Sequence, residues 1–192
     1  MSDEERLKKY ELEHFTVREL IPRSDGGVLM ITERYFRREY RNLDKGFYAA
    51  GSVRTGNSIS YSYHYEDIVV YNISSTGVVD WTSRIPKYQS SFNDNGYFLG
   101  FTHAVSSDGI YFLFNDNGMS AHQNLDRISF RNSIYSPMLY KVGQRGEVTK
   151  QSAGRLGNRL LLVPFKSTQT AANRFFIYKS KGSIQQFSVL KL

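Results

Sequence analysis

The sequence predicts an all-β protein made of repeated antiparallel hairpins. Of its 192 residues 15% are aromatic, mostly the 14 Tyr and 13 Phe, and these residues favour half-buried, pleated strands. The 15 Gly lie mostly between apolar runs, where tight turns need positive φ angles. A hydrophobic content of 40% is enough for a core, and a chain of this length buries roughly 70% of its unfolded surface. We therefore expect one folded, nearly all-β domain.

Six segments share a pattern of strand, polar turn containing glycine, and second strand. The clearest three are residues 68–81, 138–149 and 175–187, and this pattern predicts a β-hairpin. Another hairpin precedes each of them, at residues 15–35, 98–114 and, in degenerate form, 154–163. Two hairpins in succession form an antiparallel four-stranded meander, so the chain reads as a repeated meander unit.

Repeated four-stranded meanders resemble β-propeller blades, which stack face to face around an axis. Residues 13–90 form the first unit with an insertion at 36–66, residues 91–152 the second, and residues 153–192 a third, incomplete unit. Residues 1–12, with acids after Ser2, predict a short helix that leads into the first strand. A propeller closes with four to eight blades. Residues 1–192 are therefore a single propeller-like domain, a fragment of a longer propeller, an open sandwich, or one of two associating copies.

Several stretches resemble a family of uncharacterised, exported bacterial proteins with propeller-like repeats. They are residues 24–35, 67–77, 81–90 and 114–117. The resemblance covers residues 10–192 and implies that the chain matches the C-terminal part of a longer family member. It also implies export to the periplasm or cell surface, with the signal peptide outside this sequence. It implies no activity and no catalytic residue.

Charge is divided unevenly along the chain. Residues 141–192 hold ten Lys or Arg and one acid, a balance of +9, whereas residues 1–140 hold 15 basic and 17 acidic side chains, a balance of −2. The basic third predicts either a solvated face, a surface that docks on an acidic protein domain, or a binder of anionic polymers. The candidate anion-facing residues are Lys166, Arg174, Lys179 and Lys181.

The sequence argues against nucleic acid as a partner, a membrane span and cysteine chemistry. Arginines and aromatic residues alternate over 34–41, but no nucleic-acid-binding module accompanies them, so nucleic acid is an unlikely partner. No stretch approaches the ~18 apolar residues of a membrane span. The absence of Cys excludes disulfides and thiol catalysis.

The alternating tyrosines of residues 61–65 predict a strand face that could bind a ligand. Alternation places Tyr61, Tyr63 and Tyr65 together, where they can offer flat rings to a glycan or form an ordinary half-buried strand. The opposite face carries His64 and Glu66, which lack a third ligand for a metal.

The remaining polar clusters predict turns. Two copies of Phe-Asn-Asp-Asn-Gly, at 92–96 and 114–118, favour turns, although Asp94 and Asp116 could together form a weak calcium site. His103, Ser106 and Asp108 are the residue types of a catalytic triad, but no nucleophile elbow accompanies them. We therefore predict no cofactor, metal or catalytic residue, and a non-enzymatic binding or structural module. The alternatives are a carbohydrate-active hydrolase whose site gathers several loops, or an anionic-polymer binder using residues 141–192.

Overall fold

The computed structural model describes residues 14–47, 53–116, 136–153 and 160–192. Within these ranges the chain forms three antiparallel sheets of four strands each, so the predicted all-β fold is confirmed. The predicted helix at 1–12 and the degenerate turn at 154–159 lie outside the described residues.

The first two sheets are four-stranded meanders in sequence order. Sheet one contains β1 (Phe15–Pro22), β2 (Val28–Phe47), β3 (Val53–Ile73) and β4 (Val79–Phe92). Sheet two contains β5 (Thr102–Ser106), β6 (Gly109–Asp116), β7 (Ser136–Gly143) and β8 (Val148–Ser152).

The third sheet has an interrupted edge. Strands β9 (Leu161–Leu162) and β10 (Thr168–Ala171) both pair with β11 (Arg174–Lys181), and the short 3-10 helix η1 (Pro164–Lys166) separates them. Strand β12 (Ile184–Lys191) pairs with the other side of β11. The edge strand is broken at Pro164, which has no backbone N–H to donate to the ladder.

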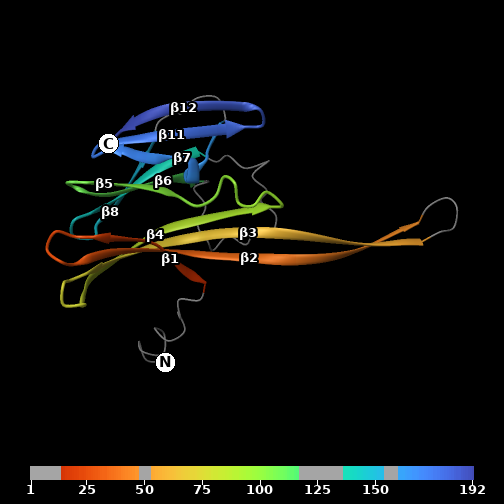
Figure 1. Cartoon of the computed structure of the whole chain (residues 1–192), viewed down its shortest axis with the longest axis horizontal. Coiled ribbons are helices and arrows are strands. Elements are labelled where there is room, and N and C mark those ends of the chain that lie inside the picture. Colours follow the sequence, from red (N-terminus) through yellow and green to blue (C-terminus); the bar gives the residue numbers. More distant parts are fainter. Residues whose placement is uncertain (1–13, 48–52, 117–135, 154–159) are drawn as a thin grey trace.

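The predicted insertion at 36–66 belongs to a long two-stranded arm. Strands β2 and β3 pair from Val28↔Ile73 to Phe47↔Val53, and Figure 1 shows this arm extending well beyond the stacked sheets. Residues 36–47 and 53–66 therefore lengthen the first sheet, whereas residues 48–52 lie outside the described residues.

The three sheets stack face to face with sheet two in the middle (Figure 1). Ile31, Ile68 and Ile85 of sheet one pack on Phe112 and Phe114 of sheet two. On the other side of sheet two, a second cluster joins Ala104, Tyr111, Leu113 and Leu139 to Leu162, Phe175 and Ile177 of sheet three. Strand β6 is thus covered on both faces, which explains its uninterrupted apolar sequence.

Three hairpins use the same turn. In β1–β2, β3–β4 and β7–β8 the glycines Gly26, Gly77 and Gly146 have φ angles of 83°, 82° and 85°, which only glycine adopts without strain. The backbone bonds repeat as well: Gly146 N donates to Gly143 O and Gly143 N to Glu147 O, and the other two turns have equivalent pairs. The glycine turns predicted at these places are confirmed.

A buried chain of polar groups, which we call the polar interlock (Glu33, Lys87, Gln89 and Asn115), joins the sheets. Lys87 Nζ donates to Glu33 at 2.7 Å and to Gln89 at 3.0 Å. Gln89 in turn donates to the Asn115 backbone oxygen at 2.7 Å. The exposed fraction of these four residues is at most 2%.

Asn115 carries the interlock into sheet three. Its amide donates to Leu162 O at 2.8 Å and to Phe98 O at 2.9 Å, and Leu162 N donates to its Oδ1 at 3.0 Å. The turn predicted at 114–118 is therefore wrong for Phe114, Asn115 and Asp116, which belong to β6. The asparagine at this place supplies inter-sheet hydrogen bonds instead of a turn.

Candidate functional site

A cavity of about 630 Å³ lies where the three sheets meet. We call it the inter-sheet cavity. Its lining includes Arg18 and Glu19 of β1, Glu33 of β2 and Tyr65 of β3 from sheet one, together with His103 of β5 and Phe165 of η1. The segment between β4 and β5 adds Asn95, Gly96 and Phe101 to the lining. The inter-sheet cavity is therefore bordered by β1 of sheet one, β5 of sheet two and η1 at the broken edge of sheet three.

A β-bulge aims two charged side chains into this cavity. The β1–β2 register shifts between Val17 and Glu19, so Arg18 is an extra residue opposite β2. Bulges of this kind redirect side chains and are common beside functional sites. Both Arg18 and Glu19 consequently line the cavity, although strict alternation would separate them.

The floor of the cavity is an ordered group of charges. Arg18 donates to Glu33 at 2.8 Å, and its guanidinium lies 5.4 Å from the Tyr35 ring centroid and 5.5 Å from that of Tyr65. Glu33 also receives the buried Lys87 ammonium, whose pKa is lowered by burial and partly restored by the Glu33 carboxylate. Two cations thus hold one buried carboxylate in place.

His103 and Phe165 form the parts of the lining that carry no fixed charge. Burial lowers the pKa of His103 and so favours the neutral imidazole, and the Glu19 carboxylate opposes this effect. The Phe165 ring is 65% exposed and meets Tyr97 edge-on at a centroid distance of 5.3 Å. Phe165 is therefore the aromatic surface that a ligand in the cavity could contact.

The three predicted tyrosines do not form one open platform. The Tyr63 hydroxyl donates to Asn95 Oδ1 at 2.8 Å and its side chain is buried. Tyr61 lies against Arg37, whose guanidinium carbon is 4.7 Å from the ring centroid. Tyr65 reaches the inter-sheet cavity. The predicted alternation places the three rings on one face, but each has a different environment.

His64 and Glu66, on the opposite face of β3, are engaged separately. His64 Nε2 is 2.9 Å from Ser62 Oγ, and its ring stacks on Phe36 at 4.5 Å. Burial lowers the pKa of His64, as does the nearby Arg38. Glu66 accepts a hydrogen bond from Arg34 at 2.6 Å.

The aspartates considered for calcium serve as local acceptors. Asp94 accepts bonds from Ser91 and from Gly96 N, and the turn predicted at 92–96 is confirmed. Asp116 accepts bonds from Lys150 at 2.7 Å and Tyr140 at 2.9 Å. Over the residues that the structure describes, no group of three His, Cys, Asp or Glu side chains is placed to hold a metal.

Of the triad residue types, Ser106 and Asp108 are hydrogen-bonded to each other and His103 lies apart from them. His103 points toward sheet one, whereas its neighbour Ala104 packs against sheet three, so alternation puts Ser106 on the far face from His103. Asp108 accepts bonds from Lys141 at 2.6 Å and Tyr111 at 2.9 Å, and these donors lower its pKa to about 2.

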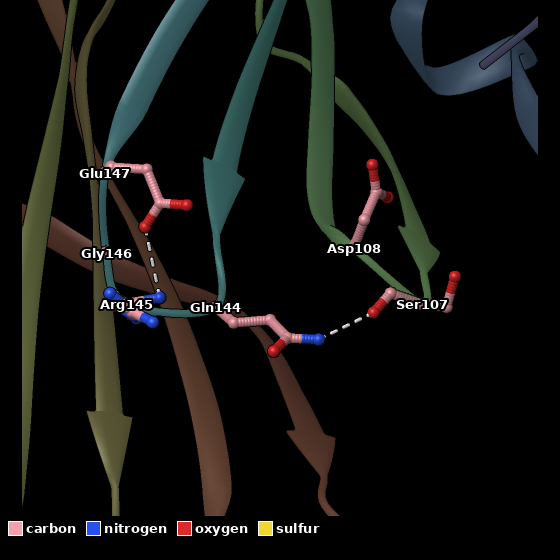
Figure 2. Close-up of a pocket in the computed structure, with 6 residues that line it drawn as sticks. All are labelled: Ser107, Asp108, Gln144, Arg145, Gly146 and Glu147. Atoms are coloured by element: carbon pink, nitrogen blue, oxygen red, sulfur yellow. Dashed lines mark hydrogen bonds between the residues drawn. The ribbon is translucent and has the colours of Figure 1, made fainter.

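Asp108 lines a second, shallow depression between two turns. Figure 2 shows the β5–β6 turn facing the β7–β8 turn, with Gln144 donating to Ser107 O at 2.7 Å and Arg145 N donating to Glu147 at 3.1 Å. These bonds occupy the polar groups of the turns themselves. The depression is therefore the space between the β5–β6 and β7–β8 turns where these two turns contact each other.

The four candidate anion-facing residues divide between environments. Lys166, Arg174 and Lys181 are exposed, but Lys179 is only 1% exposed, so the prediction that it faces an anion is wrong. Side chains alternate along β11, which turns Lys179 toward sheet two like Phe175 and Ile177.

The outer face of sheet three is apolar. Within the described residues it is exposed along β12, whereas Tyr178 on β11 is only 6% exposed and lies against Phe187 and Lys166. This face carries the cross-strand pairs Phe176↔Val189 and Tyr178↔Phe187, and both Phe187 and Val189 are 60% exposed. We call these four residues the outer apolar face. The next cross-strand pair is Arg174↔Lys191, which puts two cations at its border.

Sequence reasoning missed Arg18, Glu19, Glu33 and Lys87. A signal for the last two was present, because Ile31-x-Glu33 and Ile85-x-Lys87 continue an inward-facing apolar alternation with a charge. A charge at such a position needs a partner.

Two further results bear on function. Among the described residues, no helix has the length and apolar character needed to cross a membrane. Comparison with protein-family models, curated proteins and solved structures gives no match to this chain.

Proposed function

We propose that the chain is a non-enzymatic binding or structural module of a propeller-like protein, and that its outer apolar face stacks on a further β-sheet. One observation carries this proposal: strand β11 has the sequence of a strand buried on both faces, yet within the described residues its outer side borders β12, whose large apolar side chains are exposed. Phe175 and Ile177 pack on sheet two, while Phe176 and Tyr178 lie on the opposite face. There Phe187 covers the Tyr178 ring, and Phe187 and Val189 are themselves 60% exposed.

The interior of the stack supports this comparison. The equivalent strand of sheet two, β6, runs Ile110-Tyr111-Phe112-Leu113-Phe114, and its alternate residues pack on sheets one and three. Near-continuous apolar runs are typical of strands with both faces buried. A soluble protein gains from covering such a face, because buried apolar area contributes about 25 cal/mol per Å².

Two cations at the border of the outer apolar face indicate the charge of the partner. Arg174 and Lys191 lie directly opposite each other on neighbouring strands, and like charges in that position are destabilising. A partner sheet with carboxylates at the edge of its apolar face would relieve the repulsion. We therefore propose an apolar β-sheet face bordered by acidic residues as the occupant.

Support for a non-enzymatic role comes from the separation of His103 from Ser106 and Asp108. His103 and Ser106 lie on opposite faces of β5, and Asp108 is bound by Lys141. Export, which rests on the resemblance to exported bacterial proteins alone, stays a prediction.

Site-specific photo-crosslinking in the native cell tests the stacking proposal. A photoreactive phenylalanine analogue replaces Phe187, and a matched control replaces Val17, which is 52% exposed on sheet one. The expected result is a crosslink from position 187 to an apolar strand bordered by Asp or Glu, with none from position 17. Crosslinks from 187 back to this chain would identify a second copy as the occupant and overturn the acidic-partner assignment. No position-specific crosslink would overturn the stacking proposal.

A further inference from the structure

The inter-sheet cavity shares no lining residue with the outer apolar face, although Lys166 lies 5.8 Å from the Phe165 ring of the one and 4.9 Å from the Tyr178 ring of the other. The cavity has the features of a ligand site. Its side chains come from β1, β2, β3, β5, η1 and the segment between β4 and β5. Its volume of about 630 Å³ lies within the range of roughly 300–1,000 Å³ typical of small-molecule sites.

The polar groups of the cavity are held in fixed positions. Glu33, with an exposed fraction of 1%, is bound by Arg18 and by Lys87. Arg18 is further held over the Tyr35 and Tyr65 rings. A preorganised site of this kind loses little conformational entropy when a ligand binds.

The charged lining residues and the ion-pair partner Lys87 balance one another, and the cation Lys166 lies outside the lining, 5.8 Å from the Phe165 ring. Arg18 and Lys87 both bind Glu33, Glu19 adds a second carboxylate, and burial favours the neutral form of His103 by lowering its pKa. Within the lining, an ionic ligand would therefore find no charged side chain that is not already balanced by another. A neutral ligand that both donates and accepts hydrogen bonds suits this arrangement better.

The cavity offers both kinds of hydrogen-bonding partner beside an exposed ring. Glu19 accepts, and Arg18 donates through the N–H groups that do not bind Glu33. Asn95 Oδ1 already accepts a bond from Tyr63, so its NH2 group is the end available to donate. Phe165 adds a flat apolar surface that is 65% exposed.

We propose that the inter-sheet cavity binds a neutral saccharide. Hydroxyl groups of a sugar both donate and accept, so they can join Arg18 to Glu19 without carrying charge. The C–H face of the sugar ring can pack on Phe165. The site is for binding, and no bond is broken in it.

A glycan array probed with the fluorescently labelled protein tests this assignment, because such an array presents neutral, sialylated and sulfated oligosaccharides together. The expected result is binding to neutral glycans, confirmed by calorimetric titration with the neutral disaccharide that gives the strongest array signal. Binding only to sialylated or sulfated glycans would overturn the assignment and point to the basic residues of 141–192. Absence of binding to every glycan would overturn it as well.

Matched variants locate the site. Phe165→Ala should weaken the disaccharide affinity by about tenfold, the effect of losing one buried ring face, whereas Phe165→Trp should retain it. Phe187→Ala removes a ring of similar exposure, 60%, from the outer apolar face and should leave the affinity unchanged. Equal affinities for Phe165→Ala and wild type would place the saccharide elsewhere.

Discussion

Replacing Asn115 by alanine should be among the most damaging single changes in this protein. Three hydrogen bonds end on its side chain, two to Leu162 and one to Phe98. They connect the middle sheet to the broken edge of sheet three, where Leu161–Leu162 make only two register pairs with β11. The variant would leave the Leu162 N–H, the Leu162 carbonyl and the Phe98 carbonyl without these partners.

The expected loss follows from the number of orphaned groups. A buried donor or acceptor left unsatisfied costs roughly 1–3 kcal/mol. Three groups at the lower part of this range give a loss of about 4 kcal/mol, because the Phe98 carbonyl is only partly buried and the edge can relax. Against a typical domain stability of about 5–15 kcal/mol, that is a large fraction.

Urea denaturation followed by circular dichroism measures this loss. Gln185→Ala, an exposed position on β12, is the control and should stay within about 0.5 kcal/mol of wild type. Asn115→Asp adds a second readout: ionised, it loses both donated bonds and faces two carbonyl oxygens. Its buried carboxyl should have a raised pKa, so stability should fall as the pH rises through that pKa.

One result would refute the reasoning. If Asn115→Ala loses less than about 1 kcal/mol with an unchanged denaturant slope, the hydrogen bonds of the polar interlock do not hold the third sheet to the second.

Three further predictions concern the turns and the buried charges. Gly77→Ala should destabilise the fold by about 1–2 kcal/mol through the left-handed φ alone, because a Cβ at this position meets no other atom. Gly146→Ala should cost about 1–2 kcal/mol more, because its Cβ would lie 2.8 Å from the Ser83 hydroxyl. Equal losses of stability in urea melts would contradict this difference. Lys87→Met should cost about 3 kcal/mol by breaking a buried pair. Because burial lowers the Lys87 pKa, the folded wild type binds fewer protons than the unfolded chain, so its stability should rise as the pH approaches 10.5. Lys87→Met should abolish this rise. A wild-type stability that does not change with pH in the same melts would contradict the prediction. Lys141→Ala should move the Asp108 pKa from about 2 toward its ordinary 3.8, and an unchanged NMR titration would exclude the pairing.

The local features of this fold could be predicted because short-range chemistry decides them. The three glycine turns at Gly26, Gly77 and Gly146 need positive φ within a few residues of sequence, and apolar alternation marks the strands on either side. These two signals were sufficient for the meander order of sheets one and two.

The candidate site could not be predicted, because its geometry depends on distant residues. Lys87 meets Glu33 across 54 positions of sequence, and the bulge at Arg18 becomes visible only when β1 is paired with β2. Lys179 illustrates the same limit. In the sequence it is one of several basic residues, and only the packing of sheet three on sheet two shows that it is buried.

The two binding surfaces proposed here are physically separable, and this makes each proposal testable without the other. Phe187 lies on β12, on the face of sheet three that points away from sheet two, while Phe165 lies on η1 at the broken edge of sheet three. Both rings are about equally exposed, at 60% and 65%, so alanine at either position removes similar apolar area and should have a similar, small effect on folding. A change of Phe187 should therefore abolish sheet stacking and leave saccharide affinity intact, and a change of Phe165 should do the reverse. If either substitution removed both functions, the two surfaces would have to be parts of a single interface.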